Sequence, residues 1–271
     1  MRVTDAMSGT AGRWLLAACL ALSALPGLQG CASEPPKDDI VTASDEPEAR
    51  RRARIRLQLA VGYFEQGKTT VALDEVKQSL NIDPTFIDAY NLRGLIYMRL
   101  NDMRLAEESF RRALSLRPDD ANVLQNYGWM LCQQSRFEEG VQAFDRALAD
   151  PTYGARAKTL LTKGLCQVRA GQPSQAEESL KRSFELDAGN PVTGYNLALL
   201  LYQRGDYQRA LFYIRRINNS ELANAETLWL GIKVEQRLGN RLAREQLGRQ
   251  LRNRFPESRE LALYERGAFN E

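Results

Sequence analysis

The sequence repeats itself about every 34 residues, and this period constrains the fold more than any other feature. One series of small residues returns at intervals of 34, 34, 36, 34 and 33, namely Ala60, Gly94, Gly128, Gly164, Ala198 and Gly231. A second series keeps the same intervals: Ala72, Ala106, Gly140, Ala176, Ala210 and Ala243. A unit of this length buries its apolar face only by stacking on its neighbours. We therefore predict an array of six stacked units.

A third series marks a turn inside each unit. It lies between the other two series and comprises Gly67, Asn101, Ser135, Gly171, Gly205 and Gly239. Glycine and asparagine readily adopt the left-handed backbone conformation that ends many helices. Each unit is therefore predicted to be two helices joined by a tight turn, and the units start at residues 53, 87, 121, 157, 191 and 224.

The unit that starts at residue 87 identifies the kind of repeat. Its positions 4, 8, 11, 20, 24, 27 and 32 are Tyr90, Gly94, Tyr97, Ala106, Phe110, Ala113 and Pro118. These residues resemble the tetratricopeptide repeat at nearly every signature position. Small residues at positions 8 and 20 let the two helices approach closely, and the aromatic residues fill the space around that contact. The aromatic residues of the pattern are therefore predicted to be core.

The expected fold is an all-α, right-handed superhelical tetratricopeptide-repeat solenoid. Six helix-turn-helix repeats occupy residues 53–257, and residues 258–271 form a C-terminal capping helix. Leu261, Leu263 and Tyr264 are expected to cover the exposed end of the stack. The third unit carries two additional residues near Pro151, which should widen the loop that follows it.

Composition narrows the range of functions. The 271 residues include no histidine, which removes imidazole bases and the commonest ligand for zinc or copper. Six repeats leave no room for a catalytic domain. The net charge of +3 is too small to indicate a nucleic-acid partner. We therefore expect a protein-binding scaffold with no catalytic residue, no metal or cofactor site and no small-molecule substrate.

The first thirty residues are typical of an export signal. Arg2 and Arg13 precede an apolar run from Trp14 to Leu28. This run is shorter than a membrane-spanning helix and is interrupted by Pro26 and Gly27. Residues 1–30 are therefore predicted to be a cleaved signal peptide.

The end of this signal resembles a bacterial lipobox. Leu28 precedes Cys31 by three residues, and in lipoproteins such a cysteine is lipidated and becomes the new N-terminus. The resemblance implies lipidation of Cys31, and Ala32 after it implies an outer-membrane lipid anchor that faces the periplasm. A second stretch, which ends at Cys19, also fits the lipobox pattern. Cleavage there would leave an apolar run too short for a signal peptide. Cleavage near Ala32 without lipidation is the alternative.

Residues 31–52 are predicted to be a flexible acidic linker. From residue 32 to residue 48 the chain has six acidic residues, three prolines and only two large aliphatic side chains. Such a segment buries too little apolar surface to fold by itself.

The inner surface of a stack of repeats is lined by positions 2, 5, 9, 12 and 13 of each unit, and here these positions are largely apolar. A clamp for a C-terminal carboxylate would need polar side chains where the first unit has Leu57 and Val61. We predict instead a groove for an apolar segment, centred on the first two units. The candidates are Leu57, Val61, Phe64, Leu95 and Met98, with Trp129, Tyr195 and Tyr202 in later units. Tighter winding of the stack would make some of them core.

Two cysteines remain after the signal and the lipidation site. Cys132 and Cys166 occupy positions 12 and 10 in the first helices of adjacent units, which stack side by side. The periplasm is oxidising, so we predict a disulfide between them. Two buried free thiols are the alternative.

Three further stretches are more particular than a generic repeat: 126–132 (NYGWMLC), 150–153 (DPTY) and 163–166 (KGLC). With the lipobox and six units, they resemble the type IV pilus biogenesis lipoproteins called PilF or PilW. The resemblance covers the full chain. It implies an outer-membrane pilotin that escorts the secretin subunit of the pilus machinery and helps it to multimerise, so that pili form and twitching motility follows.

Two other functions remain open at the level of the sequence. One is a lipoprotein adaptor for cell-wall hydrolases or envelope assembly, which would use the same protein-binding repeats for a different partner. The other is an enzyme, which the missing histidine and the missing catalytic domain disfavour. Recovery of a secretin in a pull-down would separate the pilotin from the adaptor.

Overall fold

The computed structural model describes residues 45–270. The chain divides into two units, Met1–Asp45 and Glu46–Glu271, and the second unit contains every helix described. The predicted signal peptide 1–30, the lipidation site Cys31 and the linker up to residue 44 lie outside the described residues.

The second unit is all-α, and no strand occurs between residues 45 and 270. The helices, in chain order, are α1 (Glu48–Glu65), α2 (Thr69–Ile82), α3 (Ile87–Arg99), α4 (Met103–Leu116), α5 (Ala121–Gln133), α6 (Phe137–Ala149), α7 (Arg156–Arg169), α8 (Pro173–Leu186), α9 (Pro191–Gln203), α10 (Tyr207–Asn218), α11 (Ala225–Arg237), α12 (Arg241–Arg254) and α13 (Arg259–Glu265). None of the described helices is both long enough and apolar enough to cross a membrane.

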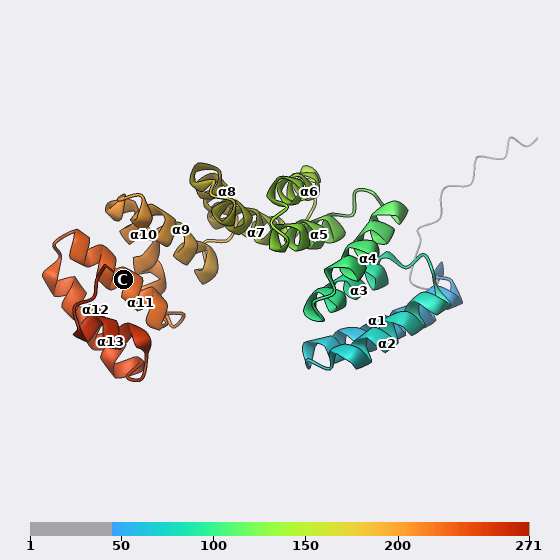
Figure 1. Cartoon of the computed structure of the whole chain (residues 1–271), viewed down its shortest axis with the longest axis horizontal. Helices are drawn as coiled ribbons and strands as arrows, with labels where there is room; N and C mark the ends of the chain where they lie inside the picture. Colours follow the sequence, from blue (N-terminus) through green and yellow to red (C-terminus); the bar gives the residue numbers. More distant parts are fainter. Residues whose placement is uncertain (1–44, 271) are drawn as a thin grey trace, which may run out of the picture. The chain divides into compact units, whose positions relative to one another are not determined.

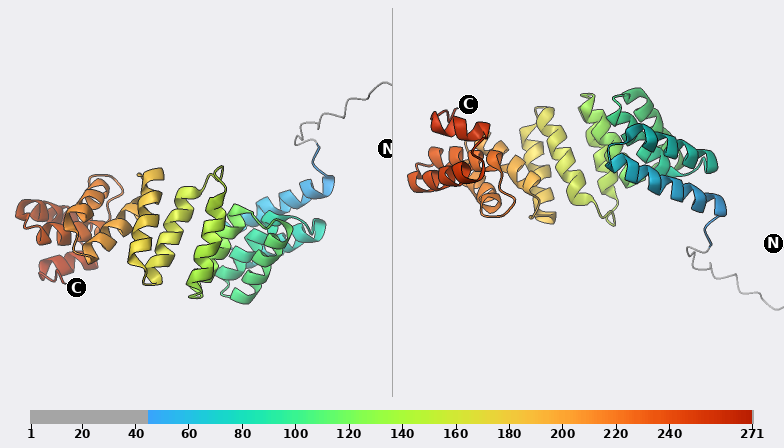
Figure 2. Two further views of the ribbon diagram at one scale, coloured as in Figure 1. Left: turned by 90° about the horizontal axis from the view of Figure 1, so that it is seen from above. Right: turned by 90° about the horizontal axis from the view of Figure 1, so that it is seen from below.

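The helices pair into six hairpins that follow one another along the chain (Figure 1). Each second helix packs against the first helix of the next hairpin, from α2 with α3 to α10 with α11. First helices also contact one another, as α1 with α3 and α5 with α7, whereas no comparable contact joins two second helices within residues 45–270. The first helices therefore form the inner layer of the stack. Figure 2 shows the succession of hairpins from two further sides.

All six predicted turn residues adopt the left-handed conformation. The φ angles are +76° at Gly67, +70° at Gly171, +81° at Gly205 and +73° at Gly239. Asn101 and Ser135 have φ angles of 60° and 62°, and they are the only residues other than glycine with positive φ in the described region. The position of each hairpin turn was therefore predicted correctly.

The two small-residue series lie where the helices of one hairpin approach most closely. A Cβ atom added to Gly128 would lie 2.9 Å from the carbonyl oxygen of Gly140, and one added to Gly140 would lie 2.9 Å from that of Gly128. In the second hairpin, a Cβ atom on Gly94 would lie 2.5 Å from the ring of Phe110. Ala106 and Phe110 are fully buried, so this closely packed contact forms the core of each repeat.

The first helix begins earlier than the sequence predicted. It starts at Glu48, so residues 48–52, which we assigned to the linker, are helical. The Arg50 side chain explains the extension because it forms an ion pair with Asp83 at the end of α2. Arg50 also donates a hydrogen bond to the Thr85 hydroxyl at 3.0 Å and lies over the Phe86 ring, 4.7 Å from its centre. These contacts hold the start of α1 against the loop that precedes α3.

The additional residues of the third unit form an anchored loop between α6 and α7. Tyr153 is buried and packs with Leu124 and Ala147. Asp150 accepts hydrogen bonds from the Thr152 backbone N–H at 2.8 Å and from its hydroxyl at 2.6 Å. The extra length therefore carries its own apolar anchor as well as widening the loop.

The capping helix α13 covers the last hairpin, but it ends at Glu265, so residues 266–270, which we assigned to this helix, lie outside it. Leu261 and Leu263 are buried against Leu228 and Ile232 of α11. The Tyr264 ring lies so close to Gly248 of α12 that it leaves no room for a Cβ atom there. Beyond the helix, Phe269 stacks on Trp229 with ring centres 5.7 Å apart. The apolar end of the stack is thus shielded from water.

Candidate partner-binding surface

All eight side chains predicted to line the groove come from first helices and keep some solvent exposure. Val61 is exposed, and the other seven are half-buried: Leu57, Phe64, Leu95, Met98, Trp129, Tyr195 and Tyr202. Winding of the stack therefore buries none of them completely. Their role in binding stays a prediction.

The candidates of the first two repeats also belong to the core. Leu57, Phe64, Leu95 and Met98 pack against the buried cluster that fills the first hairpins. Val61, at 38% exposure, is the most exposed candidate of these two repeats. The other four side chains therefore serve the core as well as offering some surface to a partner.

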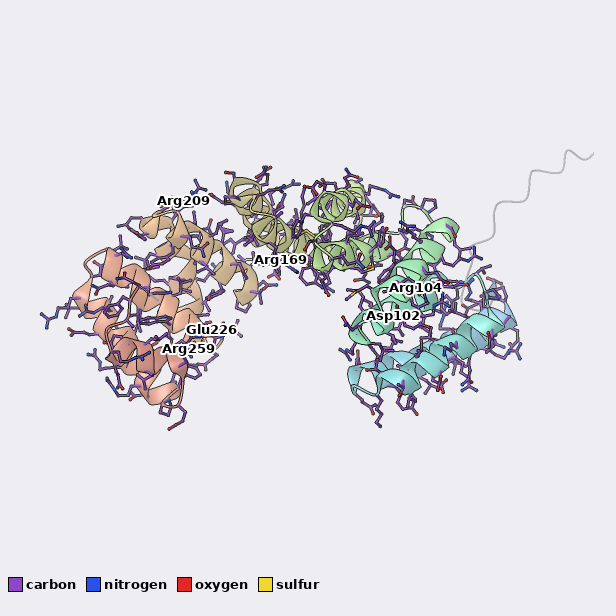
Figure 3. All side chains as sticks on the ribbon, in the orientation of Figure 1. Asp102, Arg104, Arg169, Arg209, Glu226 and Arg259 are labelled. Atoms are coloured by element: carbon purple, nitrogen blue, oxygen red, sulfur yellow. A yellow bond between two sulfur atoms is a disulfide. The ribbon has the colours of Figure 1, made fainter. Side chains whose placement is uncertain are left out.

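Several inner-layer aromatic rings are covered by a cation from the next repeat, which our sequence reasoning missed. The Arg99 guanidinium lies 4.0 Å from the centre of the Phe64 ring, and it donates a hydrogen bond to the Phe64 carbonyl oxygen at 2.6 Å. Arg169, labelled in Figure 3, lies 5.9 Å from the centre of the Trp129 ring. Both pairs share one sequence pattern. An aromatic residue stands at position 9 or 12 of one unit, and a basic residue stands at position 13 of the next unit.

A third such cation lies between the last two repeats. The Lys233 ammonium is 5.5 Å from the centre of the Tyr202 ring and 5.6 Å from that of Trp229. Burial lowers the pKa of Lys233. The inner surface therefore presents alternating aromatic rings and cations, and it is less purely apolar than the sequence suggested.

Tyr195 of α9 faces two carboxylates. It is half-buried, and burial together with the charges of Glu226 and Glu260 raises the pKa of its hydroxyl. Glu226 lies in the first turn of α11 and Glu260 in the first turn of α13. No local sequence pattern indicates this grouping, because α13 packs against α11 only in the folded chain.

Exposed apolar side chains gather in two places. The first hairpin exposes Ile55, Leu59, Val61 and Val71, of which only Val61 is one of the predicted groove residues. A second group, which we did not predict, lies around the fifth repeat and comprises Leu186, Val192, Phe212 and Leu222. Phe212 is 65% exposed and meets the Tyr213 ring edge-on, with ring centres 5.0 Å apart.

Cys132 of α5 and Cys166 of α7 are joined by a disulfide, with their Cα atoms 5.7 Å apart. Both residues are fully buried, and they pack with Phe144 at the junction of the third and fourth repeats. The bond links two helices that already contact each other. It is therefore a structural feature of the stack and lies away from the exposed surfaces. No cluster of side chains suited to holding a metal ion occurs in the part of the chain that the structure describes.

Comparisons with known proteins agree with this fold and indicate the protein family. Tetratricopeptide-repeat families match residues 87–120 and 161–219. The type IV pilus assembly protein PilF of Pseudomonas aeruginosa is 31% identical over 234 residues, which cover 86% of this chain and 92% of that protein. A solved structure of Pseudomonas aeruginosa PilF superposes with a TM-score of 0.72 at 30% identity, covering 81% of this chain and all of that one.

A second pilus protein gives a similar superposition. The crystal structure of PilW, described as a widely conserved type IV pilus biogenesis factor, has a TM-score of 0.71 at 36% identity. It covers 79% of this chain and 98% of that one. The tetratricopeptide-repeat protein YrrB, at 17% identity and a TM-score of 0.57, shares the fold alone.

Proposed function

Because the chain belongs to the PilF and PilW family of type IV pilus biogenesis proteins, we propose that it is a lipid-anchored pilotin of the outer membrane. In this role it faces the periplasm, binds the secretin subunit and promotes assembly of secretin multimers. Pilus formation and twitching motility follow from that assembly. The observation that carries the proposal is the family relationship over most of the chain, together with a repeat fold suited to binding proteins.

The apolar surface of the first repeats supports a protein partner. Val61 is exposed, and the half-buried side chains of Phe64, Leu95 and Met98 lie on the same two inner helices. Exposed apolar side chains that gather on one surface are typical of a docking site.

Substitutions at this surface test the proposal. Phe64→Ala with Leu95→Ala should reduce secretin multimers and leave monomers in the wrong membrane, because interface aromatic anchors commonly contribute 2 kcal/mol or more, about thirtyfold in affinity. Both residues also touch the core, so Val61→Asp is the companion variant. Leu242→Ala is the control, since Leu242 is 84% exposed on α12 in the last repeat.

Secretin multimers would be measured by immunoblot of membrane fractions, and circular dichroism would establish that the variants fold. The surface of the first repeats is the wrong site if the double variant and Val61→Asp both keep normal multimers. The pilotin role itself fails if deletion of the whole protein leaves secretin multimers unchanged.

A further inference from the structure

Three cavities adjoin one another where the fourth, fifth and sixth repeats meet. The first, of about 200 Å³, lies between α8, α9 and α10 and is lined by Phe184, Tyr213 and Ile217. It shares Pro191 and Leu222 with a second cavity of about 310 Å³. The second shares Tyr195 and Glu226 with a third of about 150 Å³, which reaches Trp229 and Lys233. We call this series the edge groove, because it passes over the loops 187–190 and 219–224.

The walls of the first two cavities are mostly apolar. Leu222, which lines two of the three cavities, is 55% exposed, and Val192 in the second cavity is 49% exposed. Phe184 and Tyr213 meet edge-on in the first cavity, with ring centres 5.0 Å apart. An exposed apolar surface that is concave and continuous is typical of a protein-binding site.

Two carboxylates give the groove a charge preference. Glu226 lines the second and third cavities, and Glu260 lines the third. Neither carboxylate has an ion pair or a side-chain hydrogen bond within residues 45–270. Glu226 lies in the first turn of α11 and Glu260 in the first turn of α13. In Figure 3 the Glu226 side chain projects from α11 toward solvent.

Two cations line the groove. Arg216 lies over Phe184 in the first cavity, 6.0 Å from the ring centre, and Lys233 lines the third cavity, where it lies against the Trp229 ring. The third cavity therefore combines the Tyr195 ring with two carboxylates and one ammonium group, so its carboxylates exceed its cations by one. This combination suits a lysine or arginine, which gains from both the charges and the ring face.

We propose that the edge groove binds an extended segment of a partner protein in which apolar side chains flank a lysine or arginine. The basic side chain lies on Tyr195 between Glu226 and Glu260, and apolar side chains fill the cavities at Leu222 and Phe184. An extended chain fits because each cavity has room for one or two side chains and the groove bends over a loop edge. This proposal rests on the proposed function in one respect, namely that the bound segment belongs to the secretin subunit.

Overlapping synthetic peptides that cover the secretin subunit of the same organism provide the probe. They would be tested against the purified mature chain by fluorescence anisotropy. We expect a binding peptide to contain a basic residue between apolar ones, and Glu226→Lys to weaken it by about tenfold or more. Glu138→Lys is the matched control, because Glu138 is likewise the second residue of its helix, α6, and is exposed.

A charge exchange makes the test specific. Replacing the basic residue of the bound peptide by glutamate should abolish binding to the wild-type chain and restore binding to Glu226→Lys. Leu222→Asp should also weaken binding, whereas Leu100→Asp at the turn after α3 should not, although Leu100 is 41% exposed.

The proposal is overturned if bound peptides lack a basic residue, or if Glu226→Lys and Leu222→Asp leave peptide affinity unchanged. A second outcome also overturns the proposal: intact secretin binds the wild-type chain and both variants equally well, and none of the secretin peptides binds. That outcome leaves the proposed function standing. Failure of the wild-type chain to bind either secretin or its peptides would overturn both proposals.

Discussion

Gly62 and Gly128 both lie inside helices, yet an added methyl group meets different surroundings. No heavy atom lies within 4 Å of a Cβ atom built on Gly62, whereas one built on Gly128 lies 2.9 Å from the Gly140 carbonyl oxygen. We expect Gly128→Ala to lower the free energy of unfolding by about 1–3 kcal/mol, because the clash is with backbone. Gly62→Ala should raise it by up to about 1 kcal/mol, since alanine favours helix more than glycine. Urea unfolding followed by circular dichroism measures both, and equal effects would contradict the packing argument.

Single residues also show where sequence reasoning reaches its limit. Asn101 and Ser135 could be placed in hairpin turns because the repeat period fixes their position and the turn fixes their conformation. The cover of Phe64 by Arg99 could not be predicted, because it depends on how far one repeat rotates on the next. The edge groove was missed for the same reason: its walls come from α8 to α13, and no local pattern connects them.

At the scale of elements, the start of α1 depends on a contact with a residue 33 positions away. Residues 48–52 have the composition of a solvated linker. The ion pair between Arg50 and Asp83 holds them in the helix. Sequence periodicity gave no signal for this helical extension, because residues 48–52 precede the first repeat position. The loop before α3 therefore determines where the first helix begins.

Arg50→Ala should fray the start of α1. We expect faster amide hydrogen exchange at residues 48–53 and faster tryptic cleavage at Arg51 and Arg52. Arg51→Ala is the control, because Arg51 pairs only with Glu48 of its own helix. Unchanged exchange in Arg50→Ala would show that the helix starts at Glu48 for another reason.

The same contact should depend on pH. Burial raises the pKa of Asp83, but hydrogen bonds from Arg50 and Thr85 outweigh it, so the pKa lies below the usual 3.8. A carboxylate with a lowered pKa stabilises the fold at pH values above 3.8, and this contribution is lost as the pH falls through the lowered value. Acidification should therefore fray residues 48–52 in the wild-type chain, and Asp83→Asn should remove that dependence. Hydrogen exchange followed from pH 5 downwards would reveal it, and identical profiles for the two proteins would rule it out.

For the whole molecule, the prediction concerns the anchor at Cys31, outside the described residues. Cys31→Ser should release the protein from membranes into the soluble periplasmic fraction, because several acyl chains, at about 0.8 kcal/mol for each buried methylene, anchor stably. Cys19→Ser should have no effect, since Cys19 is expected to leave with the signal peptide. Palmitate labelling and fractionation measure both variants, and membrane-bound, labelled Cys31→Ser protein would refute lipidation at this site.

If the chain is exported as proposed, the position of the disulfide has a consequence for how the chain matures. A chain that crosses the inner membrane with its N-terminus first presents Cys132 to an oxidant before Cys166, and no other cysteine occurs between residues 45 and 270. The first intramolecular disulfide that this part of the chain can form is therefore the native one. With Cys19 removed and Cys31 lipidated as proposed, the folded body needs an oxidant but no disulfide isomerase, because no wrong pairing is left to correct.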